Sequence, residues 1–152
     1  MDCSLGARAR PRLASLAMHE KRIEIRWSDV DAYEHVNNAV YATYLEECRD
    51  EWIEATLGGV GDVWDFVLAR VAIDFRREIR LEDGEVVVSC AVERVGTSSL
   101  TLREAIRTRD GEVAAEAEAV LVARDRARRG SRPLTAAERQ RFARSLRASP
   151  DV

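Results

Sequence analysis

The pattern of apolar and polar residues predicts five strands. The first alternates at Ile23, Ile25 and Trp27, and the second places apolar residues at every second position from Val67 to Phe75. A period of two is typical of a strand with one buried face. Three more strand-like runs follow at 85–95, 100–106 and 113–121. Because turn-forming pairs such as Asp-Gly separate these runs, the last four strands are expected to form an antiparallel meander.

A helical period separates the first strand from the rest. Between residues 41 and 55, apolar residues recur three and four positions apart, which indicates an amphipathic helix of about five turns. Asn37 or Asn38 is expected to cap its start, and Gly58 and Gly59 to end it. This order of elements predicts an α+β domain in which a five-stranded antiparallel sheet curls around one long helix.

The two ends of the chain lack this pattern. Residues 1–20 mix Arg, Pro, Ser and Ala without a period, and we interpret them as a mobile extension that does not qualify as a secretory signal. One domain is expected over residues 21–125. Residues 126–152 are rich in arginine and are expected to hold a short helix from about Ala136 to Leu146.

Composition narrows the classes of function. With 24 basic and 27 acidic residues the net charge is -3, which argues against a general affinity for nucleic acid or anionic membrane. No segment reaches the roughly 20 apolar residues that a membrane-spanning helix needs. The three cysteines are far apart and lack metal-ligand spacing, so neither a disulfide framework nor a metal site is expected. These features predict a cytoplasmic protein without nucleic-acid or membrane partners.

Candidate chemistry lies just before the long helix, in the stretch RWSDVDAYEHVNNAVYATYLEECR at 26–49. Asp29 and Asp31 precede a helix whose first turn leaves about four backbone N–H groups without intrahelical partners. Those groups can polarise a thioester carbonyl while a nearby carboxylate attacks the carbon or deprotonates water. Spacing alone equally allows structural roles, since acids near a helix start complement its dipole, and since Asn37 and Asn38 are ordinary caps.

Three other residues of this stretch have simple structural interpretations. His35 is a candidate general base, but a single histidine in a turn more often packs or forms hydrogen bonds. Glu46 is interpreted as solvated or salt-bridged. Cys48 falls on the apolar stripe of the helix, where core packing outranks a nucleophilic role.

The segment from Asp29 to Glu46 resembles the signature of the 4-hydroxybenzoyl-CoA thioesterase family of hot-dog proteins. That family has an Asp-x-Asp pair followed by His-Val-Asn-Asn, a tyrosine and an acid on the central helix, and this chain has DVD, HVNN, Tyr41 and Glu46. The likeness continues through the predicted strands and spans roughly residues 21–125. It implies the hot-dog fold and hydrolysis of an acyl-CoA thioester.

By this resemblance, Asp31 is the reactive carboxylate and the backbone N–H of Asn38 is the oxyanion donor. The carboxylate acts either as a nucleophile, through a mixed anhydride, or as a general base on water. The residues expected to support the site or bind substrate are Asp29, His35, Asn37, Tyr41, Ser98 and Ser99. Coenzyme A is part of the substrate, so no separate cofactor is expected.

One residue departs from the family pattern. Close relatives usually have glycine before the histidine, whereas this chain has Glu34, which tolerates a positive φ poorly and adds a negative charge near Asp31. We expect the Glu34 side chain to point to solvent.

Assembly and alternative functions remain open at this point. The resemblance implies a homodimer or homotetramer with the site at the seam, where residues 66–76 or 95–102 of a second chain would line it. Hydrolysis of acyl groups on acyl carrier protein and non-catalytic binding of acyl-CoA are the alternatives. Residues 124–147 hold nine arginines and two acids, which suit nucleic acid, coenzyme A phosphates or a neighbouring subunit, but a solvated tail is the expectation.

Overall fold

The computed structural model describes residues 18–147. One strand and a long helix come first, followed by four long strands, a two-residue strand and a second helix. The elements are β1 His19–Glu24, α1 Asn38–Leu57, β2 Phe66–Phe75, β3 Glu85–Val95, β4 Ser99–Thr108, β5 Val113–Asp125, β6 Gly130–Ser131 and α2 Ala136–Arg147. Three 3-10 turns complete the set: η1 Trp27–Asp29, η2 Val63–Asp65 and η3 Leu81–Asp83.

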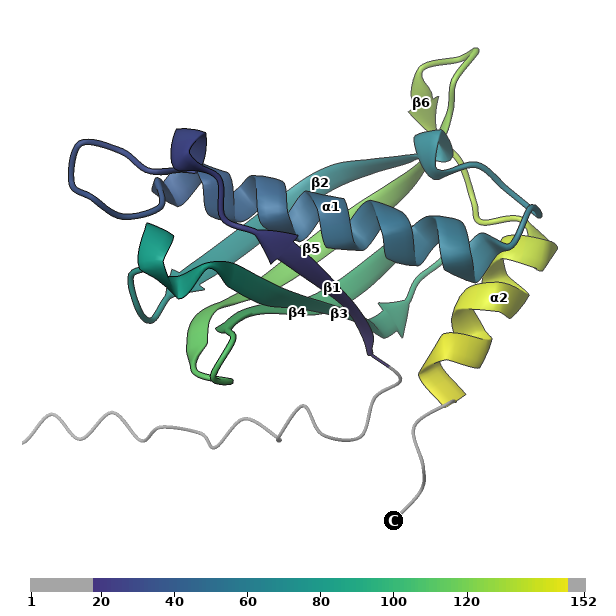
Figure 1. The fold of residues 1–152 in the computed structure, drawn as a ribbon. Helices are drawn as coiled ribbons and strands as arrows, with labels where there is room; N and C mark the ends of the chain where they lie inside the picture. The colour runs from purple at the N-terminus through teal and green to yellow at the C-terminus, as the bar shows by residue number, and fades with distance from the viewer. Residues whose placement is uncertain (1–17, 148–152) are drawn as a thin grey trace, which may run out of the picture.

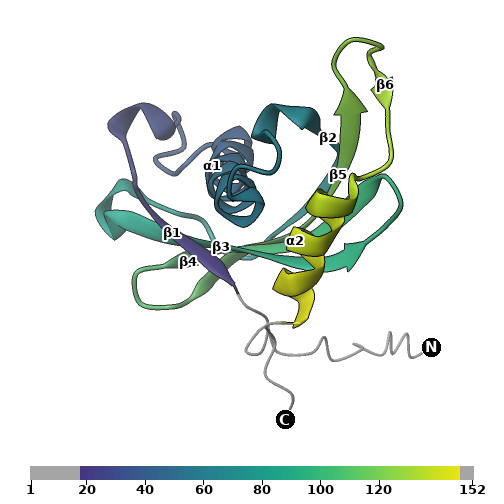
Figure 2. The same ribbon diagram turned by 90° about the vertical axis from the view of Figure 1, so that its right-hand side faces the viewer.

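The strands form an antiparallel sheet in the order β1-β3-β4-β5-β2, and β6 pairs only with β5. The sheet curls around α1, which lies along its concave side (Figure 1; Figure 2). This arrangement confirms the predicted α+β fold with five main strands around one long helix. The predicted meander of the last four strands is wrong for β2, which pairs with β5, while β3 pairs with β1 and β4. No helix within residues 18–147 is long and apolar enough to cross a membrane.

The apolar stripe of α1 forms the centre of the core, as its spacing predicts. Tyr41, Tyr44, Leu45 and Cys48 are each at most 2% exposed, and they share one cluster with the inner side chains of β3 and β4. The side chain of Asn37 accepts the N–H of Ala39 at 2.9 Å and so caps the helix start. The helix ends at a glycine with a left-handed backbone, as expected.

Arg49 is buried, although the helical pattern places it on the polar face of α1. Its guanidinium donates two hydrogen bonds to the Glu104 carboxylate of β4, at 2.8 and 3.0 Å, and both side chains are at most 3% exposed. Burial raises the pKa of Glu104, against the opposing effect of Arg49. Because an unpaired buried charge is far more costly than a buried pair, each residue makes the other tolerable in the core.

The ends of the domain differ from the boundaries expected from the pattern. β1 begins at His19, two residues earlier than expected, and Trp27 is 83% exposed at the start of η1 instead of continuing a buried strand face. The rest of the expected extension, residues 1–17, lies outside the described residues. The expected C-terminal helix is α2, but it is no solvated tail, because Phe142 is fully buried against Trp52 of α1 and Phe66 of β2.

β2 is the one long strand with both faces exposed. It forms an edge of the sheet, and its exposed apolar side chains include Leu68, at 42%, and Phe75, at 47%. The alternation of apolar residues predicted one buried face for this strand. Within a single chain that prediction is wrong, because α1 lies mainly over β1, β3 and β4 and covers only part of the inner face of β2, where Tyr41 meets Phe75.

Candidate active site

The loop between η1 and α1 folds back on itself and brings the predicted residues to the helix start. Val30 and Val36 form an isolated bridge, and the Asp31 N–H donates to the His35 carbonyl at 3.1 Å. Val36 is fully buried, and its N–H donates to the Ile79 carbonyl at 2.7 Å, which fastens the loop to the segment after β2. The loop is therefore closed by the Val30–Val36 bridge and attached at Val36 to the segment after β2.

The Asp31 carboxylate is held next to the helix start by two donors. One oxygen accepts the N–H of Tyr33 at 2.9 Å, and the other accepts the side-chain amide of Asn37 at 3.2 Å. The Asp31 side chain remains 22% exposed. The carboxylate is thus oriented but still reachable, which is what a reactive group requires.

The first turn of α1 offers a free backbone donor. The N–H of Ala39 is satisfied by the Asn37 side chain, and the N–H of Val40 donates to the Asn37 carbonyl at 2.8 Å. Within the described residues, no protein acceptor satisfies the N–H of Asn38. A free N–H at the positive end of a helix dipole is suited to stabilising a developing oxyanion.

Asp29 has different surroundings from Asp31, although only one residue separates them. It is 6% exposed and accepts the Tyr44 hydroxyl at 2.6 Å and the Arg26 backbone N–H at 3.0 Å. Burial alone would raise the pKa of Asp29, but the hydrogen bonds from Tyr44 and Arg26 and the Arg26 charge outweigh it and lower the pKa. Its backbone carbonyl also accepts the Asn37 N–H at 2.9 Å. Asp29 therefore fastens η1 to α1.

His35 lies between two carboxylates without a hydrogen bond to either. Its Nδ1 is 4.0 Å from Asp31 Oδ1, and its Nε2 is 3.9 Å from Glu78 Oε2. The ring stacks on the exposed ring of Tyr33, with centroids 5.9 Å apart. His35 therefore borders the site. It forms no hydrogen bond to Asp31, whereas a catalytic histidine base is normally oriented by a hydrogen bond to an acid.

Two hollows adjoin the loop. The first, of about 300 Å³, is lined by His35, Asn38, Tyr41, Phe75 and the following segment 76–78. The second, of about 510 Å³, is lined by Asp31 together with Trp27, Val30, Glu34 and residues 80–82. In one chain the candidate carboxylate and the candidate oxyanion donor therefore line different hollows. Asn37 connects them, because it donates to the carboxylate and caps the helix that carries the donor.

Tyr41 forms an apolar wall of the smaller hollow. Its hydroxyl donates to the Arg77 carbonyl at 3.0 Å, and its ring meets Phe75 edge-on with centroids 5.0 Å apart. Burial raises the pKa of Tyr41. With its hydroxyl occupied in this way, Tyr41 presents a ring to the hollow.

Glu34 and Cys48 fit the interpretations drawn from the sequence. Glu34 has φ 65°, so the chain places a glutamate where the backbone favours glycine, and the residue is exposed at the rim of the larger hollow. Cys48 is fully buried, and burial raises the pKa of its thiol to about 12. A thiol in that environment is a packing group.

Ser98 and Ser99 lie at the opposite end of the sheet from Asp31. Ser99 pairs with Val122, whereas Phe75, which borders the smaller hollow, pairs with Ala115. Ala115 and Val122 are seven positions apart along β5, a span of roughly 23 Å. One chain therefore does not bring the two serines to the helix start.

Sequence reasoning missed Tyr44 and Glu78 as neighbours of the site. Tyr44 lies on the apolar stripe of the helix, so its spacing signals packing and gives no sign of its hydrogen bond to Asp29. Glu78 lies in an irregular segment after β2, for which no period predicts a position. In the part of the chain that the structure describes, no three His, Cys, Asp or Glu side chains are grouped to hold a metal ion.

Comparison with known proteins identifies the family of the chain. Residues 25–150 match the thioesterase-like superfamily. A thioesterase from Thermus thermophilus, solved with coenzyme A and zinc, is 31% identical with a TM-score of 0.78, and the match covers 91% of this chain and 99% of that one. A predicted thioesterase from Bacillus stearothermophilus is 26% identical with a TM-score of 0.77, covering 86% and 97%.

A curated relative supports the same relationship. The long-chain acyl-CoA thioesterase FadM of Escherichia coli (strain K12) is 29% identical over 105 residues, which are 64% of this chain and 76% of that protein. The family match covers most of the chain, and the solved relatives share its curled sheet and long helix. The chain therefore belongs to the thioesterase-like superfamily, a family of hot-dog thioester hydrolases.

Proposed function

We propose that this protein hydrolyses acyl-CoA thioesters, with Asp31 as the reactive carboxylate and the Asn38 N–H as the oxyanion donor. The observation that carries the proposal is the free Asn38 N–H on the helix start to which Asn37 ties the Asp31 carboxylate. The thioesterase solved with coenzyme A and the acyl-CoA thioesterase of E. coli support coenzyme A as the carrier.

Two routes lead to the same products. In the first, Asp31 attacks the thioester carbon, negative charge develops on the carbonyl oxygen against the Asn38 N–H, and the C–S bond breaks to give a mixed anhydride that water then hydrolyses. In the second, Asp31 takes a proton from water as the water attacks the carbon. In the first route water attacks the acyl carbon of the anhydride and releases the Asp31 carboxylate. In both routes the oxygen atom added to the acyl group then comes from water, and coenzyme A leaves as the thiol.

The supporting residues act on the geometry of the site in this proposal. Asn37 orients the Asp31 carboxylate and caps the helix, while Tyr41 walls the smaller hollow beside Asn38. His35 borders that hollow and is available to a substrate once bound. The proposal needs no cofactor, since coenzyme A enters as part of the substrate.

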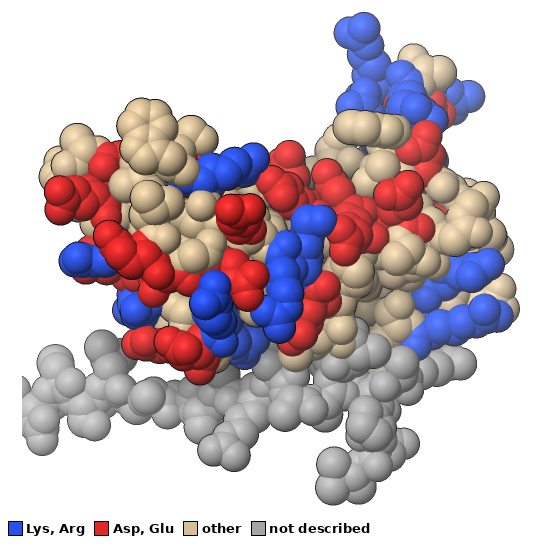
Figure 3. Space-filling model, in the orientation of Figure 1, with Lys and Arg blue, Asp and Glu red and all other residues tan. Residues whose placement is uncertain are grey.

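Assembly and surroundings are part of the same proposal. A homodimer or homotetramer is supported by the exposed edge strand β2 and by the separation of Asp31 and Asn38 into two hollows within one chain. The exposed side of α1 carries Glu46, Asp50 and Glu54, and Figure 3 shows acidic and basic groups mixed over this face. The net charge of -3 disfavours nucleic acid and anionic membranes as partners. A cytoplasmic location remains a prediction.

The test is thiol release from a panel of aromatic, short-chain and long-chain acyl-CoAs, with acyl carrier protein thioesters in parallel. We expect turnover of at least one acyl-CoA and a loss of at least about 100-fold in Asp31→Asn. Asp110→Asn, in the exposed hairpin between β4 and β5, is the matched control and should keep full activity.

Two results would contradict the proposal. Acyl-CoA binding by calorimetry without any turnover would indicate a binding module instead of an enzyme. Turnover restricted to acyl carrier protein thioesters would move the proposed activity to the other carrier.

A further inference from the structure

The hollow beside Asn38 contains two side chains to which the proposed reaction gives no chemical role. His35 and Glu78 both line it, while Asp31 lines the other hollow. His35 lies between the two acids, because its Nδ1 is 4.0 Å from Asp31 Oδ1 and its Nε2 is 3.9 Å from Glu78 Oε2. The ring therefore presents one nitrogen toward Asp31 and the other toward Glu78.

A hydrogen bond within the loop identifies the free nitrogen of this ring. Nδ1 of His35 lies 3.3 Å from the carbonyl oxygen of Val36. A carbonyl oxygen only accepts, so the hydrogen of this contact is on Nδ1, and a neutral ring then has its lone pair on Nε2. The ring of Tyr33 stacks on the imidazole, with the two planes 15° apart. These two contacts fix the direction of Nε2.

Glu78 offers a second acceptor beside Nε2. Its Oε1 accepts a hydrogen bond from Arg80 at 2.8 Å, which leaves Oε2 toward the ring. The hydrogen bond and the charge of Arg80 lower the pKa of Glu78, so the group is a carboxylate at neutral pH. The side chains of His35 and Glu78 are 29% and 48% exposed. Nε2 and Oε2 are thus two neighbouring acceptors that solvent can reach.

Two acceptors at this separation suit one water molecule. A water that donates one hydrogen to each acceptor at about 2.8 Å completes a triangle with the 3.9 Å side, and the angle at its oxygen is roughly 90°. The hollow, of about 300 Å³, has room for such a water and supplies the polar partners that it needs. Both hydrogens are then directed to protein, and the lone pairs of the water oxygen are left for an electrophile.

We propose that His35 and Glu78 hold the water that hydrolyses an acyl group attached to Asp31. The inference rests on the proposed hydrolysis and assigns the first of its two routes, because an Asp31 that carries the acyl group cannot also act as the base. The water oxygen bonds to the acyl carbon, one of its hydrogens passes to Nε2 of His35, and the bond from that carbon to the Asp31 oxygen breaks. The products are the free acid and the Asp31 carboxylate, and the imidazolium returns its proton to solvent.

His35 is the base among the titratable groups that line this hollow. Tyr41 donates its hydroxyl to a backbone carbonyl, and burial raises its pKa. Arg76 and Arg77 remain protonated and cannot accept a proton. Glu78 is a weak base, since Arg80 lowers its pKa, so it orients the water while the imidazole takes the proton.

Trapping of an acyl-enzyme tests the step. His35→Phe keeps a stacked ring and removes both nitrogens, so cleavage of the thioester should outpace loss of the acyl group. We expect a burst of about one thiol per subunit, followed by turnover about 100-fold slower than in the parent. Mass spectrometry should show the added acyl mass on the variant, peptide mapping should place it on Asp31, and the parent should show no adduct.

Two outcomes of this experiment have different meanings. A folded His35→Phe variant that turns over without a burst and without an adduct overturns the inference and leaves the proposed hydrolysis standing. A parent that releases no thiol from any acyl-CoA contradicts the proposed function itself.

Glu78→Gln tests the second acceptor. We expect kcat to fall about tenfold with KM changed less than about twofold, because the water loses one of its two holders while substrate binding is untouched. The acyl adduct should again accumulate, which a purely structural role for Glu78 would not cause. In the His35→Phe background the same substitution should add less than about twofold, since both residues act on one water. Additive losses overturn the shared water.

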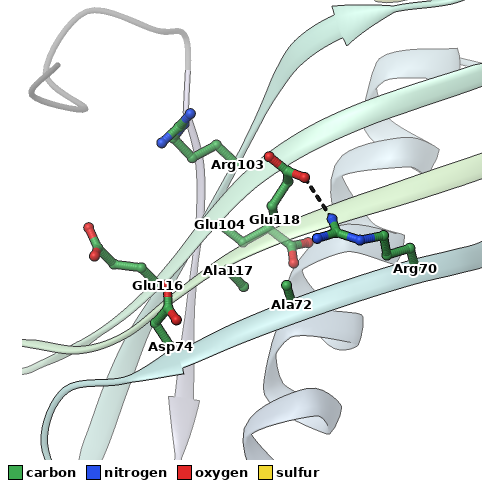
Figure 4. A pocket seen from close by; sticks show the side chains of 8 residues that line it. All are labelled: Arg70, Ala72, Asp74, Arg103, Glu104, Glu116, Ala117 and Glu118. Atoms are coloured by element: carbon green, nitrogen blue, oxygen red, sulfur yellow. Dashed lines mark hydrogen bonds and ion pairs between the residues drawn. The ribbon is translucent and has the colours of Figure 1, made fainter. Parts of the chain in front are cut away.

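Glu118→Gln is the matched control for this substitution. The Glu118 side chain is also 48% exposed and accepts a hydrogen bond from an arginine, Arg70, at 2.7 Å. This pair lines a separate charged hollow formed by β2, β4 and β5 (Figure 4). The control should keep the kcat of the parent and form no adduct. If Glu78→Gln behaved like Glu118→Gln in both measurements, Glu78 would have no part in holding the water.

Discussion

The two ends of α1 are built in opposite ways. At the C-terminal end, α2 packs beside the end of α1 (Figure 1). Its buried Phe142 ring contacts the rings of Trp52 and Phe66. At the N-terminal end, a loop of polar residues leaves hollows, an exposed carboxylate and a positive φ at Glu34. Apolar burial therefore stabilises one end of α1, while hydrogen bonds hold the other end in a shape that leaves a carboxylate and a backbone N–H accessible.

The largest expected effect is at the closed end. Phe142→Ala removes a fully buried ring, and such truncations lower the free energy of unfolding by about 3–5 kcal/mol. We expect urea denaturation to show a loss in this range while the activity of the remaining folded protein is unchanged. A loss below about 1 kcal/mol would mean that α2 does not complete the core.

A smaller effect is expected at the hydrogen bond from Tyr44 of α1 to Asp29 of η1. Tyr44→Phe deletes only the hydroxyl, and a hydrogen bond to a charged group contributes about 1.5–3 kcal/mol. The free energy of unfolding at neutral pH should fall by that amount. Thr43→Val, an exposed neighbour on the same helix, is the control and should change little.

The same contact predicts a pH dependence. The pKa of Asp29 is lowered in the folded protein, so its contribution is fully present above the pKa of the unfolded chain, about 3.9, and is lost as pH falls through the lower folded value. Unfolding free energies of parent and Asp29→Asn, measured from pH 6 downward, should therefore converge in this acid range. If the two curves of unfolding free energy against pH stayed parallel across this range, Asp29 would not be the source of the acid-dependent stability.

The smallest effect is expected at the strained residue of the open end. Glu34→Gly relieves a positive φ and should stabilise the fold by up to about 1 kcal/mol, because a left-handed backbone disfavours residues with a Cβ while glycine loses more entropy on folding. Arg129→Gly, at φ 55° in the hairpin after β5, is the matched control and should give a similar gain. A gain at Arg129 alone would show that Glu34 makes compensating contacts.

Sequence patterns predicted the fold well where they depend on residues close together in the chain. Spacing placed the buried face of α1, and Asn37 and Gly58 have their predicted roles at its ends because capping depends on neighbouring residues only. The alternation in β2 is as regular as in the other strands, but burial of its faces depends on what packs above them, which period alone does not encode.

The site shows the same division. The loop residues and the helix start lie together because they are adjacent in sequence. Ser98 and Ser99 depend on the topology of the sheet, and the topology places them at its other end. The sequence did not predict the burial of Phe142, because arginines surround it in the chain. It did not predict the burial of Arg49 either, because its partner Glu104 is distant in sequence.

The most direct test of the account compares the two acids of the Asp-x-Asp pair. Steady-state thiol release and the free energy of unfolding would be measured for Asp31→Asn and Asp29→Asn side by side. We predict that Asp31→Asn loses at least about 100-fold in kcat/KM with a change in stability below about 1 kcal/mol, and that Asp29→Asn loses more stability and keeps more activity. Parent-like kcat/KM in folded Asp31→Asn would contradict the account.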